Sequence, residues 1–378
     1  MAGKIDWGAF KPYQGGQEIN VKTGFRGAVA TGTAIAALAA GGSAGAQEVI
    51  QMTAIDGYPP KALQVQTFIE YFIPEVDKRL AATNKYKIRW NQAFAGQIAK
   101  VRNVLPAIEA GLGDIGVVTT VFHQDKVPLQ AIAYVTPFVT SDPVLVSQTF
   151  DALTEALPAI QKDWSGYNQR VLTSFSVIDS YEMFFREKVT DIKEFNGLKI
   201  AGAGINMRYL TGTGATPVVG SMVNYYNQLK ANAIDGAMLW TEAAVAFKLV
   251  EGAPYMLQAN IGTANSKAIT INSDVYNRLP AEVRDAIVAV SADYRDYTAK
   301  AALAEAGQAL ADYKAAGGEI VPMSDAARQS WADTMPNIAT EWAAELDAKG
   351  QPGGAMLTAW MDRMRAANQP ILRQWDKE

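Results

Sequence analysis

The chain has no cysteine and a single histidine, His123, among its 378 residues. Cysteine-ligated zinc, iron–sulfur clusters, a cysteine nucleophile and disulfide bonds are therefore excluded, and a serine triad would have to use His123. Lys and Arg together number 34, against 38 for Asp and Glu, so the basic excess typical of nucleic-acid binders is also missing. We therefore expect no nucleic-acid partner.

Nucleotide-binding loops are missing as well. Gly202-Ala203-Gly204 resembles the start of a dinucleotide loop, but Met207 stands where the third glycine is needed. The Thr-Gly-Thr-Gly sequence at residues 211–214 lacks the Lys-Ser/Thr pair of a phosphate loop. The sequence thus predicts no cofactor and no catalytic residue, and it argues against an enzyme.

No apolar run reaches the ~20 residues that span a bilayer. The run at residues 28–40 follows Lys22 and Arg26, and small residues stand at −3 and −1 of a cleavage point after Ala46. This order is typical of a secretory signal peptide, here residues 1–46, and it predicts a periplasmic mature chain. An N-terminal membrane anchor and a buried alanine-rich helix are the alternatives.

Apolar residues make up 49% of the chain, which is enough for a large core. Alternating or β-branched runs predict strands at residues 86–90, 115–121, 171–175, 198–201, 234–239 and 268–272. A helical pattern covers residues 62–80 with an interruption at Pro74, and a second one from Pro280 to residue 316 is ~55 Å long. The alternation predicts an α/β fold with parallel sheets in two domains and one helix that spans both.

Three groups of residues resemble a known family in order and spacing. They are residues 96–105 with 111–114, residues 135–138, and residues 195–200 with 214–217, 224–229 and 234–236. The last group includes Gly-Leu-Lys-Ile, Gly-Ala-Thr-Pro and Ile-Asp-Gly. Together they resemble the extracytoplasmic solute-binding subunit of TRAP transporters, the DctP-like family.

This resemblance implies a two-lobed periplasmic binding protein with a long helix, residues 280–316, that spans both lobes. Lobe 1 would comprise residues 47–170, completed by parts of 258–378, and lobe 2 residues 171–257. The implied function is capture of a small organic solute, an organic acid in most members, and its delivery to the membrane permease subunits of a TRAP transporter. A subunit of an ABC importer, a ligand-binding sensor and a secreted α/β hydrolase or lyase are the alternatives.

Members of the family hold the ligand carboxylate with an arginine, and Ala201 occupies that position here. Either another cation replaces it, with Arg208 and Lys100 as candidates, or the ligand is not a simple carboxylate. Aromatic residues at strand ends favour an aromatic or bulky acid. The expected ligand-binding residues are Tyr58, Lys100, Thr120, Phe122, His123, Tyr181, Arg208, Asn224, Trp240 and Thr241. No metal ligand is expected, and Glu242 is the one carboxylate considered for that role.

Overall fold

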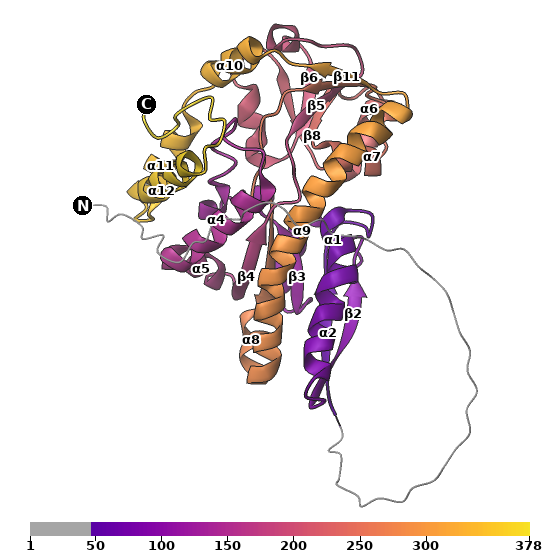
Figure 1. Ribbon diagram of the computed structural model, residues 1–378, viewed down its shortest axis with the longest axis vertical. Helices are drawn as coiled ribbons and strands as arrows, with labels where there is room; N and C mark the ends of the chain where they lie inside the picture. The colour runs from indigo at the N-terminus through magenta and orange to yellow at the C-terminus, as the bar shows by residue number, and fades with distance from the viewer. Residues whose placement is uncertain (1–46) are drawn as a thin grey trace, which may run out of the picture.

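The computed structural model describes residues 47–378, so the predicted signal peptide lies outside the described residues. This part of the chain folds into two sheets with helices packed around them, as Figure 1 shows. None of the helices between residues 47 and 378 is long and apolar enough to cross a membrane. The predicted α/β class is confirmed.

The first sheet has five strands in the order β2-β1-β3-β10-β4. β1 runs parallel to β2 and β3, whereas β10 runs antiparallel to β3 and β4. Every residue of β3 and β10 is buried, as expected of strands that are covered on both faces. The strands are β1 (Glu48–Ile55), β2 (Tyr86–Ala93), β3 (Ile115–Thr119), β4 (Gln169–Phe175) and β10 (Lys267–Asn272).

The second sheet has six strands in the order β11-β9-β5-β8-β6-β7. β6 is parallel to β7 and β8, β9 is parallel to β11, and β5 is antiparallel to β8 and β9. The strands are β5 (Glu182–Phe185), β6 (Lys199–Gly202), β7 (Thr216–Val219), β8 (Gly236–Leu239), β9 (Tyr255–Gln258) and β11 (Glu319–Pro322).

The expectation of purely parallel sheets was wrong. The chain crosses from the first sheet to the second between β4 and β5, returns between β9 and β10, and crosses again through α9 to β11. The first two crossings enter the new sheet at the edge where its parallel strands end, so β5 and β10 run in the opposite direction. This reversal places the first residues of β5 and β10 between the two sheets. The predicted lobe boundaries themselves stay predictions.

Twelve α-helices pack around the two sheets within residues 47–378, and the last three form a C-terminal group. They are α1 (Leu63–Thr67), α2 (Ile73–Ala81), α3 (Val104–Glu109), α4 (Pro143–Ala156), α5 (Pro158–Ser165), α6 (Met222–Lys230), α7 (Thr241–Ala246), α8 (Ser273–Arg278), α9 (Ala281–Ala315), α10 (Asp325–Thr334), α11 (Ile338–Ala348) and α12 (Gly353–Ala366). A π-helical segment, Phe68–Phe72, joins α1 to α2 and leaves Pro74 in the first turn of α2. Residues 63–81 are continuously helical, and the π-helical turn directly before Pro74 accommodates the hydrogen bond that proline cannot donate.

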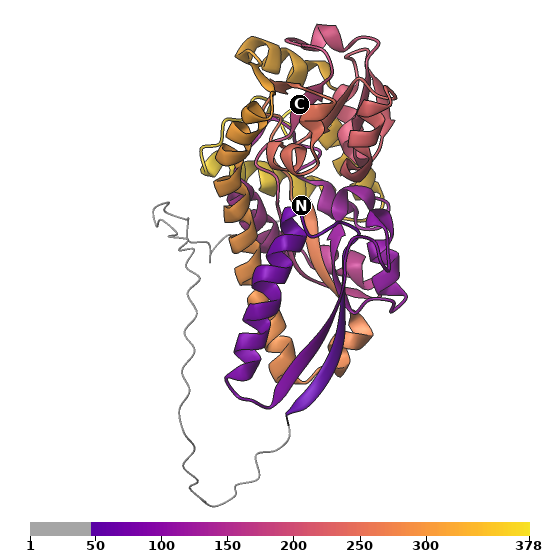
Figure 2. The ribbon, with the colours of Figure 1, turned by 90° about the vertical axis from the view of Figure 1, so that its right-hand side faces the viewer.

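The long helix expected at residues 280–316 is confirmed as α9, which runs along both sheets in Figures 1 and 2. Tyr294 in its first half is fully buried and packs edge-to-face on Phe175 of the first sheet, with ring centroids 5.1 Å apart. Tyr313, near its end, packs on Phe184 of the second sheet at 5.5 Å. α9 therefore connects the cores of the two sheets.

The C-terminal helices α10–α12 add a second connection. Trp331 of α10 is fully buried, and its ring packs edge-to-face on Phe138 at 5.6 Å and on Phe195 at 5.3 Å. Its indole N–H donates to the carbonyl oxygen of Tyr209, 2.7 Å away. One side chain thus joins segments that are far apart in the sequence.

We expect Trp331→Ala to lower the free energy of unfolding by about 3–5 kcal/mol, because it leaves a large cavity and removes a buried hydrogen bond. Urea unfolding followed by circular dichroism measures the change. The control is Leu303→Ala in α9, whose side chain is 44% exposed and whose loss should matter by less than about 0.5 kcal/mol. Equal effects of the two substitutions would contradict the assignment of Trp331 to the core.

Candidate functional site

A small cavity lies where the carboxyl ends of parallel strands from the two sheets face each other. Tyr58 follows β1 and Thr119 ends β3 on one side, while Ala203 follows β6 and Trp240 follows β8 on the other. Ligands bind beyond such strand ends in many α/β proteins. The cavity volume is about 30 Å³, comparable to the share of one molecule in liquid water. An organic ligand therefore fits only if the two sheets separate and the side chains repack.

Six aromatic side chains line the cavity. Its aromatic residues are Tyr58, Phe122, Tyr134, Tyr181, Tyr225 and Trp240. The rings of Tyr181 and Trp240 meet edge-to-face with centroids 6.0 Å apart, and the indole N–H of Trp240 donates to Glu242 Oε2 at 3.0 Å. These contacts hold the ring of Trp240 in place, so one wall of the cavity is preorganised.

The cavity contains one charged side chain, that of Lys267 at the start of β10. Its ammonium group donates to Thr119 Oγ1 at 3.1 Å and lies 4.8 Å from the centroid of the Tyr58 ring. The residue is 1% exposed, and burial lowers the pKa of Lys267 while the nearby Asp56 opposes that shift. The site therefore presents a cation that has lost nearly all of its water.

Asp56, two residues before Tyr58 in the chain, is also buried. Its Oδ1 accepts a hydrogen bond from the backbone N–H of Tyr58 at 2.8 Å, while its Oδ2 makes none. Burial raises the pKa of Asp56, and the charge of Lys267 opposes that rise. Asp56 and Lys267 are thus electrostatic neighbours, although no ion pair joins them.

Two further polar groups line the cavity without a hydrogen-bond partner, namely the hydroxyls of Tyr134 and Ser266. Both residues are at most 2% exposed. A buried hydroxyl without a partner is costly, so such groups are suited to a polar atom that arrives with a ligand.

Arg102 closes the cavity from outside. Its guanidinium group stacks over the ring of Phe122, 4.3 Å from the centroid, and Nη2 donates to the carbonyl oxygen of Gly220 at 3.1 Å. Gly220 follows β7 of the second sheet, whereas Arg102 precedes α3 beside the first. Arg102 therefore links the two halves at the rim.

The structure brings four of the sequence-predicted residues to the cavity wall: Tyr58, Phe122, Tyr181 and Trp240. Thr120 and Thr241 are buried nearby with their hydroxyls engaged, Thr120 on the carbonyl oxygen of Asn265 and Thr241 on the sulfur of Met256.

Lys100 and Asn224 are exposed and lie on a shallow surface depression beside Arg102, outside the cavity. No described contact connects either side chain with the cavity wall. Their contact with a ligand stays a prediction.

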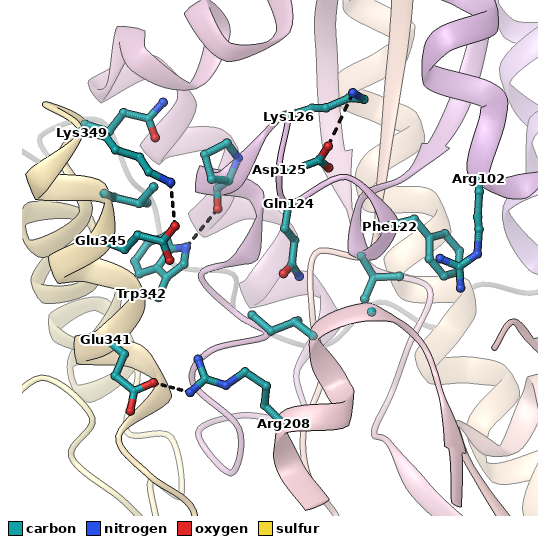
Figure 3. Close-up of a pocket in the computed structure, with 16 residues that line it drawn as sticks. Arg102, Phe122, Gln124, Asp125, Lys126, Arg208, Glu341, Trp342, Glu345 and Lys349 are labelled. Atoms are coloured by element: carbon teal, nitrogen blue, oxygen red, sulfur yellow. Dashed lines mark hydrogen bonds and ion pairs between the residues drawn. The ribbon is translucent and has the colours of Figure 1, made fainter. Parts of the chain in front are cut away.

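Arg208 lies in an open groove of about 860 Å³ next to the cavity (Figure 3). It forms an ion pair with Glu341 of α11, and the indole N–H of Trp342 on the same helix donates to the carbonyl oxygen of Pro128 at 3.1 Å. Phe122 lines both the groove and the cavity. Arg208 therefore lies in the space next to the cavity, but it is not one of the residues that line the cavity. Its contact with a ligand also stays a prediction.

The carboxylate considered for a metal, Glu242, is held by the indole N–H of Trp240, and burial raises the pKa of Glu242 to about 7. Within residues 47–378, no group of three or more His, Asp or Glu side chains is placed to hold a metal ion.

The sequence reading missed Lys267, Asp56, Tyr134 and Ser266. The available indication was the position of Ser266 and Lys267, two polar residues directly before the apolar strand expected at residues 268–272. A polar residue that begins a buried strand lies at the edge of its sheet, where ligands bind.

Family comparison agrees with this geometry. Residues 60–345 match the family described as bacterial extracellular solute-binding protein, family 7. A solute-binding protein of Albidiferax ferrireducens is 24% identical over 148 residues, which are 38% of this chain and 44% of that protein. A monocarboxylate 2-oxoacid-binding periplasmic protein of Nostoc is 23% identical over 260 residues, 68% of this chain and 70% of that protein.

Among solved structures, a TRAP solute-binding protein of Rhodoferax ferrireducens in complex with copurified benzoate superimposes with a TM-score of 0.76. The match covers 84% of this chain and 98% of that one at 16% identity, which shows a shared two-lobed fold.

His123, which follows the turn after β3, allows a spectroscopic test of burial at that end of the strand. It is 3% exposed, its Nε2 makes no hydrogen bond, and burial lowers its pKa to about 4. Because it is the single histidine of the chain, its imidazole resonance in a proton NMR titration is unambiguous. We expect a midpoint near pH 4, and a midpoint near 6.5 would contradict the burial.

The same shift predicts a pH effect on stability. Between pH 6.5 and 4 the unfolded chain binds a proton at His123 that the folded chain does not, so this residue destabilises the fold as the pH falls. The full effect is about 3 kcal/mol below pH 4. Urea unfolding of His123→Gln beside the parent chain measures it as a smaller loss of stability in the variant over that pH range.

Proposed function

The chain belongs to the bacterial extracellular solute-binding proteins of family 7, and from this premise we propose that it captures a small organic acid between its two lobes and delivers it to the membrane permease of a TRAP transporter. The observation that carries the proposal is the aromatic cavity with one buried cation between the facing strand ends. The acids in the descriptions of the Nostoc protein and the Rhodoferax complex support an anionic ligand for this chain as well.

Capture by a closing cleft requires that the two lobes move relative to each other. The crossing segments between the sheets pair with each other through backbone hydrogen bonds, Tyr181 N–H to Gly262 O at 3.0 Å and Ile261 N–H to Tyr181 O at 3.1 Å. A few residues at the ends of strands, as in these segments, can form a hinge. A ligand that contacts both lobes then stabilises the closed form, because it makes those contacts only when the lobes are together.

Export of the protein follows from the same proposal. The family is extracellular, and residues 1–46 have the order of a signal peptide that is removed near Ala46. The mature protein would then meet its solute outside the cytoplasmic membrane, where the permease can receive the closed lobes.

A thermal-shift screen of the mature protein, residues 47–378, tests the capture of an acid. The panel contains aromatic and aliphatic monocarboxylates, dicarboxylates and sugar acids, each beside its neutral amide. A ligand at one hundred times its Kd stabilises the folded state by about 2.7 kcal/mol, which raises Tm by several degrees. We expect acids to raise Tm and their amides to do so weakly.

Two controls make the screen decisive. The protein is first unfolded and refolded to remove copurified molecules, and mass spectrometry confirms that it is empty. If no acid then raises Tm, the proposal is refuted. Recovery of a bound acid in chemically altered form would favour the hydrolase or lyase alternative.

We also expect Arg102→Met to reduce ligand affinity by about two- to tenfold, since the closed form loses the hydrogen bond to Gly220 while the ligand pocket keeps its wall. Titration calorimetry measures the affinity, and small-angle X-ray scattering should show the liganded variant as less compact on average. An unchanged affinity together with unchanged scattering would show that the link across the rim does not contribute to closure.

A further inference from the structure

We propose that Lys267 holds the carboxylate of the ligand, and that the site selects monocarboxylates with an apolar or aromatic body. This inference rests on the proposed function and names the residue and the substrate class for it. It places the cation on β10 of the first sheet, whereas Ala201, the position at which the family resemblance expects an arginine, lies on β6 of the second sheet.

Burial distinguishes Lys267 from the other basic residues. Among residues 47–378 it is the one Lys or Arg that is buried. Arg208 is paired with Glu341, and Lys100 is exposed outside the cavity. Lys267 is also the one charged side chain on the cavity wall. A ligand enclosed in this cavity therefore has one cation to meet.

The ammonium group of Lys267 has capacity for an anion. It carries three N–H donors, and one of them is used on Thr119 Oγ1 at 3.1 Å. The face of the Tyr58 ring stabilises the positive charge, but it does not neutralise it. No carboxylate of the described residues forms an ion pair with Lys267, and Asp56 acts on its charge from a distance without a hydrogen bond to the ammonium group. A buried charge of this kind is stabilised when an anion arrives.

The neighbouring hydroxyls suit a carboxylate rather than a neutral carbonyl. Tyr134 and Ser266 each place an unpartnered, buried hydroxyl on the wall of the same cavity as Lys267. A hydroxyl can donate to a carboxylate oxygen, and hydrogen bonds to ionised groups are stronger than those between neutral groups. A carboxylate that bonds to Lys267 with one oxygen has a second oxygen for such a donor.

The rest of the wall restricts what the carboxylate is attached to. The remaining lining groups are uncharged, and they are mainly rings and thioether or aliphatic chains, such as Trp240, Tyr181, Met222 and Met238. A second carboxylate would lose its water with no cation to pair with. Methionine side chains adapt readily to ligands of different shape, which allows the small cavity to widen around a ring or an alkyl chain.

The test compares Lys267→Met with the parent chain in titration calorimetry. Methionine keeps the apolar stem and removes the charge. The probes are benzoate, phenylacetate and hexanoate, with benzamide as the neutral partner of benzoate and succinate as the dicarboxylate. Lys314→Met at the end of α9 is the matched control, because this lysine is exposed and does not line the cavity.

We expect at least one of the monocarboxylates to bind the parent chain, and Lys267→Met to weaken it by about 30-fold or more. Lys314→Met should bind as the parent does. Benzamide should be affected little by Lys267→Met, since the lost interaction is with the charge. If the parent and Lys267→Met bind the monocarboxylate equally, Lys267 is not the anchor.

Loss of the ammonium leaves Asp56 buried without its positive neighbour, so Lys267→Met alone could destabilise the fold. The double variant Asp56→Asn with Lys267→Met removes both charges and keeps the comparison valid, and circular dichroism confirms that each variant is folded. If the double variant binds the monocarboxylate as tightly as Asp56→Asn does, the proposal is overturned.

The probes also separate this inference from the proposed function. If succinate or a sugar acid binds while all three monocarboxylates fail, the substrate class is wrong although capture of an acid stands. If no acid in the wider panel binds the emptied protein, the proposed function itself has failed.

Discussion

One helix, α9, determines how the two sheets are placed relative to each other. Its 35 residues carry one buried tyrosine into each core, and both hydroxyls donate to backbone carbonyls: Tyr294 to Gln64 at 2.7 Å and Tyr313 to Ala253 at 2.6 Å. Because both cores pack on the same continuous helix, neither sheet can shift along it without breaking these buried contacts. In the proposed capture, the two lobes would therefore move by rotation about the short crossing segments.

The crossing segments are fixed where they meet the second sheet. Glu182, at the start of β5, accepts hydrogen bonds from the backbone N–H groups of Ala259 at 2.5 Å and Asn260 at 2.9 Å. Burial raises the pKa of Glu182 to about 8, in spite of these two donors, because the carboxyl group has lost its water. The hydrogen bonds set the position at which both segments leave the sheet. Tyr181 precedes Glu182 directly, so the same contacts place an aromatic wall of the cavity at the hinge.

Local patterns were sufficient for the elements with strong periodicity. The helix at α9 and the strands β3, β4 and β10 follow from apolar spacing alone. The short strands β5, β7, β9 and β11 were not predicted, whereas β6 and β8, of the same length, follow from their buried apolar runs. The reversed direction of β5 and β10 could not be predicted, because it depends on where the chain crosses between sheets and not on the residues of either strand.

The sequence predicted four aromatic residues of the cavity wall but did not predict its charged residue, Lys267. The difference has one physical reason. Tyr58, Phe122 and Trp240 follow strands in the sequence, so their position at a strand end is local information. The burial of Lys267 comes from Thr119 and Tyr58, which are distant in sequence, and a lysine is otherwise expected in solvent. In the proposed capture, Lys267 on the first sheet would hold the ligand carboxylate, and Tyr181 and Trp240 beside the second sheet would cover its apolar body.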